Sequence, residues 1–279
     1  MKVVYSRSEA SEYCLNQLKE GNSVGFVPTM GALHKGHIGL ILKAKSENDV
    51  VVVSIFVNPA QFNNQEDFNN YPNTLESDVL KLKESGCDMV FVPSVEDMYP
   101  SGVRLLDFDI SNYDSVMEGK FRPGHFNGMI TVVDLFFSAI TPTKAYFGEK
   151  DFQQLLIIKE LAKNRYPSME IIPCATDRDD NGLALSSRNM RLNSDDYQIA
   201  IQIPKVLGLG KQLKQQNAPN ETAELLRIEL NKVNGLRLEY LEILDDRNLL
   251  KLSDWKSGCS RVFVAAFVGS VRLIDNMAL

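Results

Sequence analysis

Residues 24–45 read VGFVPTMGALHKGHIGLILKAK, and this stretch decides the fold of the chain. It begins with a short apolar run that is closed by Pro28 and Gly31, and it continues as an amphipathic segment at Ile38–Ala44. This change of pattern predicts a strand, a turn and a helix in succession. A helix start presents free backbone N–H groups and the positive end of the helix dipole, so the junction favours an anion such as phosphate.

Two of the chain's three histidines, His34 and His37, lie at this junction in the sequence HKGH. At a spacing of three residues they share one side of a turn or of an opening helix. They can simply satisfy polar groups of the first helical turn, or they can donate hydrogen bonds to a bound phosphate. Metal binding is a further alternative, but neither an HExxH pattern nor a third ligand at a characteristic spacing accompanies the pair. The pattern favours phosphate over a metal.

Length and composition predict an intracellular globular protein of one or two domains. The chain has 279 residues, 44% of them hydrophobic, and its formal charge of −6 argues against a general nucleic-acid surface. Its four cysteines are widely separated and form no CxxC pair, so neither a zinc site nor a disulfide framework is expected. The N-terminus lacks the apolar core of a signal peptide, and the longest apolar run is far shorter than the ~20 residues of a membrane helix. We therefore expect a cytoplasmic protein that binds neither nucleic acid nor membrane.

The pattern of residues up to about 176 alternates between strand and helix. Val50–Val57 is rich in β-branched residues on both faces, as a central parallel strand covered by helices requires. With the two segments before it, this strand completes a βαβ unit. Asn58 and Pro59 end it at the sheet edge where open α/β sheets place ligands, so Gln61 is expected beside the first loop. Further strands are predicted at 24–27, 89–92, 105–110, 145–147 and 169–175, and helices at 8–19, 75–85 with Thr74 as the cap, 152–164 and the apolar half of 121–140.

The character of the chain changes near residue 176. The next segment, TDRDDNGLALSSRNMR, is polar and charged, which is typical of a linker or of a mobile active-site loop. Helices are then predicted at 195–216 and 221–234, and strands at 236–244, 261–267 and 271–274. We therefore predict an α/β protein with a doubly wound, mainly parallel Rossmann-like sheet in residues 1–176 and a smaller α+β lid domain in residues 177–279.

The segment GEKD at 148–151 has a structural and a chemical interpretation. Asp151 and Gln154 have the spacing of a capping box, so they can simply begin a helix. Lys150 lies at a strand-to-helix junction, where a lysine can act as a point charge on phosphate. The sequence contains neither a dinucleotide-binding fingerprint nor a P-loop, so a nucleotide would be held in another way.

Two further segments also have both a structural and a chemical interpretation. In SSRN at 186–189 the hydroxyls can cap a helix, or with Arg188 they can clamp a phosphate. In RPGHF, Arg122 and His125 can form a turn that packs on the core, or they can contribute to a polar site.

Taken together, these motifs resemble those of one protein family. PTMGALHKGH, SIFVNPAQF, YPNT, RPGHFNG, FGEKDFQQL, NGLALSSRN and the final RLIDN look like the motif set of the pantothenate synthetases, in order and at suitable spacing. The resemblance covers residues 24–276, nearly the whole chain. HKGH resembles the HxGH signature of the wider nucleotidyltransferase superfamily, and LSSR resembles its second, mobile phosphate-binding signature.

The resemblance implies an ATP-dependent, AMP-forming ligase in a homodimer. Such an enzyme condenses (R)-pantoate with β-alanine to pantothenate, a coenzyme A precursor, through a pantoyl-adenylate, and it releases pyrophosphate and then AMP. Mg²⁺ would be bound through the ATP phosphates rather than in a protein cage. The alternative is another HxGH-type nucleotidyltransferase that acts on a small carboxylate or phosphate acceptor.

The resemblance also assigns roles to residues of this chain. His34, His37, Lys150 and Arg188 would be catalytic, with His37 as the donor to the phosphates. Gln61 and Gln154 would hold pantoate, and Gln61 would also bind β-alanine. The residues expected to bind ATP are Met30, Gly31, Ala32, Leu33, His34, Lys35, Gly36, His37, Gly148, Glu149, Lys150, Asp151, Asp177, Leu185, Ser186, Ser187 and Arg188.

The sequence departs from the family pattern at a few positions. Asn73 replaces a usual Arg in YPRT, and Asn181 replaces Asp before GLA. Asp134 and Leu135 stand where a polar residue and Lys are common. Asp177 occupies a usually aliphatic position whose backbone contacts adenine, a contact that tolerates a change of side chain. None of these departures touches a proposed catalytic group.

Overall fold

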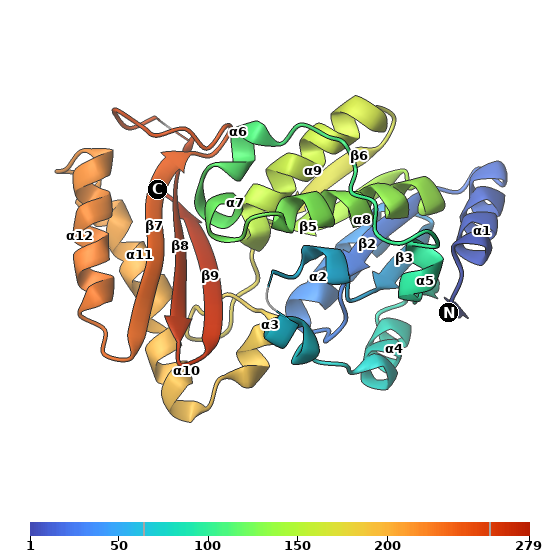
Figure 1. Cartoon of the computed structure of the whole chain (residues 1–279), viewed down its shortest axis with the longest axis horizontal. Helices are drawn as coiled ribbons and strands as arrows, with labels where there is room; N and C mark the ends of the chain where they lie inside the picture. The colour runs from blue at the N-terminus through green and yellow to red at the C-terminus, as the bar shows by residue number, and fades with distance from the viewer. Residues whose placement is uncertain (64, 257) are drawn as a thin grey trace. The chain divides into compact units, whose positions relative to one another are not determined.

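The stretch that begins at Val24 forms an inner strand, β2 (Val24–Thr29), of a six-stranded parallel sheet in the computed structural model (Figure 1). The structure describes residues 1–63, 65–256 and 258–279. The strand order is β1 (Lys2–Val4), β4 (Met89–Phe91), β3 (Val50–Ile55), β2, β5 (Lys144–Gly148) and β6 (Glu170–Cys174). From β2 the chain therefore adds strands on one side of β2 and then on the other. This reversal of direction makes the junction between β2 and β5 the switch point of a doubly wound sheet. The predicted fold class is confirmed.

The inner strands of this sheet are buried on both faces because their apolar residues point alternately to each side. In β2, Phe26 belongs to a cluster with side chains of helices α1 (Arg7–Lys19), α8 (His125–Ile140) and α9 (Phe152–Arg165) on one face. Val27 belongs to a cluster with side chains of α2 (Lys35–Glu47) and α4 (Leu75–Glu84) on the other face. In β3, Val52 and Val53 divide between the same two clusters. A continuous β-branched run can therefore be buried completely, which explains the pattern of residues 50–57.

The chain divides into two units. The first comprises Met1–Glu149 and Gln154–Ala175, and the second comprises Lys150–Gln153 and Thr176–Leu279. The sequence-based division at residue 176 grouped Lys150–Gln153 with the first domain, whereas these residues pack with the second unit. The elements up to residue 175 are β1 (Lys2–Val4), α1 (Arg7–Lys19), β2, α2 (Lys35–Glu47), β3 (Val50–Ile55), η1 (Pro59–Gln61), α3 (Gln65–Asn69), α4 (Leu75–Glu84), β4 (Met89–Phe91), α5 (Val95–Met98), α6 (Ser111–Asp114), α7 (Met117–Phe121), α8 (His125–Ile140), β5 (Lys144–Gly148), η2 (Glu149–Asp151), α9 (Phe152–Arg165) and β6 (Glu170–Cys174).

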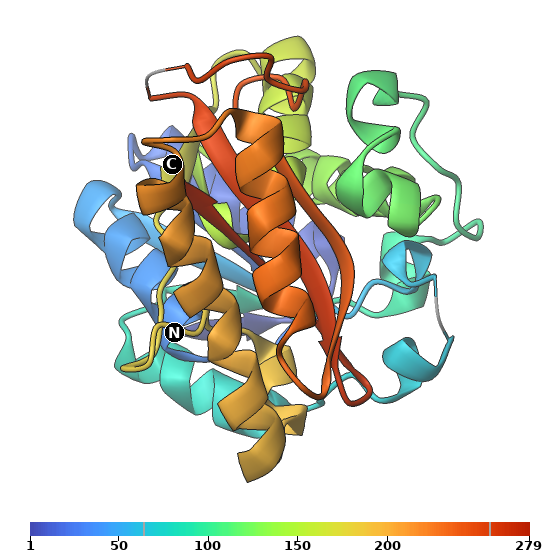
Figure 2. The same cartoon turned by 90° about the vertical axis from the view of Figure 1, so that its left-hand side faces the viewer.

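The second unit is built on a three-stranded antiparallel sheet in the order β7 (Leu236–Asp245), β8 (Ser260–Val268) and β9 (Val271–Ala278). Figure 2 shows α11 and α12 side by side over one face of this sheet, where their apolar sides form a separate core with it. The elements after residue 175 are η3 (Ser187–Arg191), α10 (Ser194–Ala200), α11 (Gln202–Leu213), α12 (Pro219–Asn231), β7 (Leu236–Asp245), β8 (Ser260–Val268) and β9 (Val271–Ala278). Every helix in the described ranges is too short or too polar to cross a membrane.

Three predictions about single elements are wrong. Residues 105–110 form no strand. The Leu106 N–H donates to Thr131 Oγ1 in helix α8 at 2.9 Å, so a side chain of α8 provides the acceptor that a neighbouring strand would otherwise provide. The predicted helix at 195–216 is two helices that meet at Ile201, because Pro204 cannot donate to a carbonyl four residues earlier. Thr74 occupies the N-cap of α4 without capping it, since its hydroxyl donates to the Asp78 carboxylate at 3.0 Å instead.

Candidate functional site

The candidate residues of the first unit follow three neighbouring strands at one edge of the parallel sheet. Met30–His34 follows β2, Asn58–Gln61 follows β3, and Gly148 ends β5. Because β3, β2 and β5 are adjacent and parallel, these segments lie at the carboxyl edge beside the switch point, where open α/β sheets bind ligands.

The segment Met30–His34 is a loop in a demanding backbone conformation. Gly31 has φ 82° and Ala32 has φ 51°, so both lie in the left-handed region. For a residue with a Cβ this conformation costs energy and requires fixed surroundings. The Gly31 N–H donates to Thr29 Oγ1 at 3.1 Å, which closes the start of the loop onto the strand.

A buried carboxylate holds the centre of this loop. Asp78 is 1% exposed, and its two oxygens accept hydrogen bonds from the backbone N–H groups of Ala32 and Leu33, each at 2.8 Å. Lys81 donates to the Leu33 carbonyl at 2.8 Å. Our interpretation of the sequence missed Asp78, although the helical spacing of Leu75 and Leu82 does place this acidic residue on the apolar face of α4.

The two histidines are in direct contact at the start of α2. His34 is the N-cap residue, and its backbone N–H donates to His37 Nδ1 at 3.3 Å. The two ring centroids lie 4.0 Å apart, with 35° between the ring planes. A neutral imidazole that accepts at Nδ1 carries its proton on Nε2, so the helix start presents His37 as a hydrogen-bond donor. Lys35 is exposed beside them and Gly36 is half-buried.

Gln61 is fixed between the first loop and the end of β3. Its Oε1 accepts from Asn58 Nδ2 at 3.1 Å, and its Nε2 lies 3.1 Å from the Met30 sulfur. The Tyr99 hydroxyl donates to Asn58 Oδ1 at 2.8 Å. Burial raises the pKa of Tyr99 to about 12, so this hydroxyl remains a donor at neutral pH. The structure thus joins Met30 and Gln61, two predicted site residues, through side chains alone.

The segment RPGHF also positions Gln61. Arg122 Nη1 lies 3.1 Å from His125 Nε2, and since a guanidinium only donates, His125 keeps its proton on Nδ1. That Nδ1 donates to the Gln61 carbonyl oxygen at 2.8 Å. His125 is the first residue of α8 rather than part of the loop ahead of it. The structure therefore favours the interpretation of RPGHF as a turn that packs on the core. It also shows that this turn supports the backbone of Gln61.

The remaining candidates follow β5 or belong to the second unit. Gln154 is half-buried in the first turn of α9, and Glu149 opens η2. Lys150 has a largely covered side chain, and its Nζ lies 3.7 Å from the Asp151 carboxylate. The described hydrogen bonds connect Gln154 neither to Gln61 nor to Asp151, so this pair does not form the capping box that its spacing allows.

The 177–188 segment carries the other predicted phosphate ligands. The Leu185 N–H donates to the carbonyl oxygen of Asp177 at 2.9 Å, which closes the segment on itself. Ser186 is the N-cap of η3, and its Oγ accepts from the Arg188 N–H at 3.3 Å. The capping interpretation of SSRN is therefore correct for Ser186, while Ser187 is buried in the first turn of η3.

Comparison with known proteins identifies the family of this chain. The sequence model of the family described as "Pantoate-beta-alanine ligase" matches residues 2–278. The chain belongs to this family. A pantothenate synthetase of Bacteroides thetaiotaomicron is 43% identical over 282 residues, which cover 99% of this chain and 98% of the relative. The resemblance seen in the sequence motifs is confirmed.

Solved structures of pantoate-beta-alanine ligases share the fold over the whole chain. The pantothenate synthetase of Thermus thermophilus superimposes with a TM-score of 0.92 at 39% identity, covering 99% of both chains. The pantoate-beta-alanine ligase of Francisella tularensis, complexed with "Beta-gamma ATP" and β-alanine, gives a TM-score of 0.83 at 41% identity, covering 99% of this chain and 97% of that one.

Proposed function

We propose that the protein condenses (R)-pantoate with β-alanine at the expense of ATP, through a pantoyl-adenylate, and releases pyrophosphate and then AMP. The observation that carries this proposal is the family match over residues 2–278. The ligand-bound structure of the Francisella tularensis relative supports ATP and β-alanine as substrates. The protein is accordingly a ligase of pantothenate biosynthesis.

The first step is attack of the pantoate carboxylate on the α-phosphorus of ATP, with pyrophosphate leaving. Negative charge builds up on the phosphate oxygens, so fixed donors and cations are the main source of catalysis. In this proposal His37 donates from Nε2, because its Nδ1 accepts from the His34 N–H. Lys150 and Arg188 supply positive charge, and Ser186 and Ser187 belong to the same phosphate-binding segment.

The second step is attack of the β-alanine amine on the acyl carbon, with AMP leaving. The amine must be uncharged, and water must be kept away from the mixed anhydride. We assign pantoate to Gln61 and Gln154, and the β-alanine side to Gln61. The support for this assignment is the rigid setting of Gln61, whose side chain and backbone are both held by hydrogen bonds.

Mg²⁺ and a second subunit complete the proposal. Among residues 1–63, 65–256 and 258–279 there is no group of three His, Cys, Asp or Glu side chains that could hold a metal ion. We propose that the magnesium ion is held by the phosphate oxygens of ATP, which are ligands that Mg²⁺ prefers. We also propose a homodimer, on the resemblance to the family.

Isotope exchange between pyrophosphate and ATP tests the two-step reaction. The wild-type protein should exchange labelled pyrophosphate into ATP when pantoate and Mg²⁺ are present and β-alanine is omitted, because the adenylate forms reversibly. Omitting pantoate should abolish the exchange, and adding β-alanine should release one AMP per pantothenate. An absence of pantoate-dependent exchange would refute the adenylate, and a product that retains the nucleotide would favour the nucleotidyltransferase alternative.

A further inference from the structure

The C-terminal motif RLIDN, at Arg272–Asn276, has no part in the chemistry described so far. Its last two residues lie in β9 and are almost completely buried: Asp275 is 5% exposed and Asn276 is 4% exposed. Successive side chains of a strand point to opposite faces, so this pair can hold two different segments of the chain. It does so with the two segments of the second unit that carry proposed phosphate ligands.

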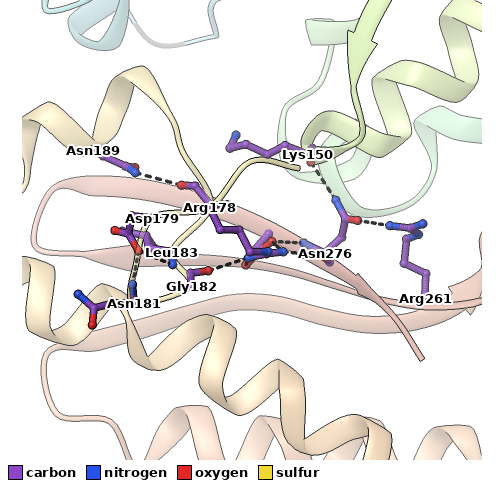
Figure 3. Close-up of polar contacts among 11 residues, drawn as sticks. Lys150, Arg178, Asp179, Asn181, Gly182, Leu183, Asn189, Arg261 and Asn276 are labelled. Carbon is purple, nitrogen blue, oxygen red and sulfur yellow. Dashed lines mark hydrogen bonds and ion pairs between the residues drawn. The ribbon is translucent and has the colours of Figure 1, made fainter. Parts of the chain in front are cut away.

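The Asn276 amide joins the backbone of Lys150 to Arg261 (Figure 3). Its Nδ2 donates to the Lys150 carbonyl oxygen at 3.0 Å, and its Oδ1 accepts from Arg261 Nη1 at 2.6 Å. The Arg261 guanidinium also lies over the Phe152 ring, 4.1 Å from its centroid, and that ring lies 5.8 Å from the ring of Phe263. Polar, cation–π and aromatic contacts thus hold the segment that contains Lys150 on β8 and β9.

The Asp275 carboxylate makes a bidentate pair with Arg178. Nη1 and Nη2 of the guanidinium donate to its two oxygens at 2.7 and 2.8 Å, the geometry of a strong, directional contact. The same guanidinium donates to the carbonyl oxygens of Asn276 at 3.1 Å and Gly182 at 2.9 Å. Hydrogen bonding to Asp275 raises the pKa of Arg178, so the cation is kept at any physiological pH. The start of the 177–188 segment is therefore attached to β9.

Hydrogen bonds inside the 177–188 segment extend this attachment toward its phosphate ligands. The Asp179 carboxylate accepts from the N–H groups of Asn181 and Leu183, each at 2.9 Å (Figure 3). The Leu185 N–H donates to the Asp177 carbonyl oxygen at 2.9 Å. The segment is thereby closed into a compact turn that ends directly before the SSR sequence.

We propose that Asp275 and Asn276 are positioning residues, which fix Lys150 and the 177–188 segment in one arrangement suited to the triphosphate of ATP. The inference rests on the proposed function, since it takes these two segments as phosphate ligands. In Figure 3 the Lys150 carbonyl faces Asn276 and its side chain extends away from the amide, so the hydrogen bond orients the backbone from which the ammonium projects. A displacement of about 1 Å in such a group can cost about a hundredfold in rate, which makes this support valuable.

The variant Asn276→Asp tests the amide with little change of shape. A carboxylate keeps the acceptor for Arg261, but it removes the donor to the Lys150 carbonyl and sets two oxygens against each other. We expect the dissociation constant for ATP, measured by calorimetry, to rise about tenfold or more, because the Lys150 carbonyl oxygen loses its buried donor and meets a carboxylate oxygen instead. Pantoate-dependent pyrophosphate exchange should fall with it, whereas the KM for β-alanine should stay near the wild-type value.

A double-mutant cycle separates positioning from general stabilisation. If Asn276 acts through Lys150, then Asn276→Asp should change ATP affinity less than about twofold in a Lys150→Ala background, because the two effects share one cause. An equal loss in both backgrounds would overturn the proposal for Asn276. Asp275→Asn in an Arg188→Ala background tests Asp275 in the same way, with the same criterion.

A control variant, a substitute variant and two distinguishable outcomes keep the experiment decisive. Asn248→Asp, in the same unit, keeps the acceptor for the Leu250 N–H and should leave ATP affinity unchanged. If Asn276→Asp does not fold, Asn276→Ser enters the same cycle, since serine is uncharged and too short to contact both the Lys150 carbonyl and Arg261, so it removes the link without adding a buried charge. Wild-type protein that binds ATP without pantoate-dependent exchange would refute the proposed reaction alone. Unchanged ATP affinity in both Asn276 variants would refute the positioning role alone.

Discussion

Asp78 supplies the acceptors for two backbone N–H groups of the loop that precedes His34. In Asp78→Asn the amide offers one oxygen, so one buried N–H loses its acceptor, at a cost of about 1–3 kcal/mol. We expect a lower thermal midpoint and a KM for ATP raised at least several-fold, because the loop that presents the histidines relaxes. Glu76→Gln, exposed on the same helix, is the matched control. A wild-type KM for ATP in Asp78→Asn would show that the loop does not depend on this carboxylate.

Asp78 also illustrates which parts of the site the sequence reveals. HKGH could be placed correctly because a strand, a turn and a helix start are specified by neighbouring residues. The acceptors that fix this loop come from a residue 45 and 46 positions away, and no local pattern links them. The same holds for Asn276, whose partner Lys150 is 126 positions away. Residue types that bind phosphate can be read locally, whereas the residues that position them depend on the folded chain.

At the scale of elements, η1 and α8 approach so closely that only glycine fits at position 128. A Cβ there would overlap the Ala60 carbonyl and lie 2.8 Å from the Gln61 nitrogen. Gly128→Ala should therefore displace η1 and with it Gln61, at an overpacking cost of about 1–3 kcal/mol. We expect higher KM values for pantoate and β-alanine with a smaller change for ATP, measured by steady-state kinetics.

Gly208→Ala is the matched control for this substitution. Gly208 lies in α11 with open space around its Cβ position, so alanine should leave the kinetics unchanged and stabilise the helix by up to about 1 kcal/mol. Wild-type KM values in Gly128→Ala, combined with an unchanged thermal midpoint, would contradict the close approach.

The elements that were predicted correctly are those whose own sequence carries the signal. Val50–Ile55 is apolar on both faces, and the parallel sheet buries both faces. Residues 105–110 also contain regularly spaced apolar residues, but Leu106 and Phe108 pack against the core without a partner strand. Burial alone explains their pattern, so a short apolar alternation is an ambiguous signal.

At the scale of the whole molecule, the four cysteines lie in different parts of the fold, so the reactivity of each thiol reports on its own surroundings. Cys14 belongs to the cluster on one face of the parallel sheet, and Cys87 and Cys174 belong to the cluster on the other face. Cys259, in the second unit, is half-exposed. Burial raises the pKa of Cys14 and of Cys87 to about 12, so at pH 8 both are thiols rather than reactive thiolates.

Alkylation at pH 8 should therefore modify Cys259 first in the native protein, with all four cysteines reacting in denaturant. Between these limits, Cys14, Cys87 and Cys174 should become reactive over the same range of urea, because both faces of the sheet lose their cover when its strands separate. Mass spectrometry of alkylated peptides measures each site. Cys259→Ser should remove the fast reaction and leave the other three unchanged. If Cys14 became reactive at a urea concentration at which Cys87 and Cys174 were still protected, the helices on one face of the sheet would be separating before the first unit unfolds as a whole.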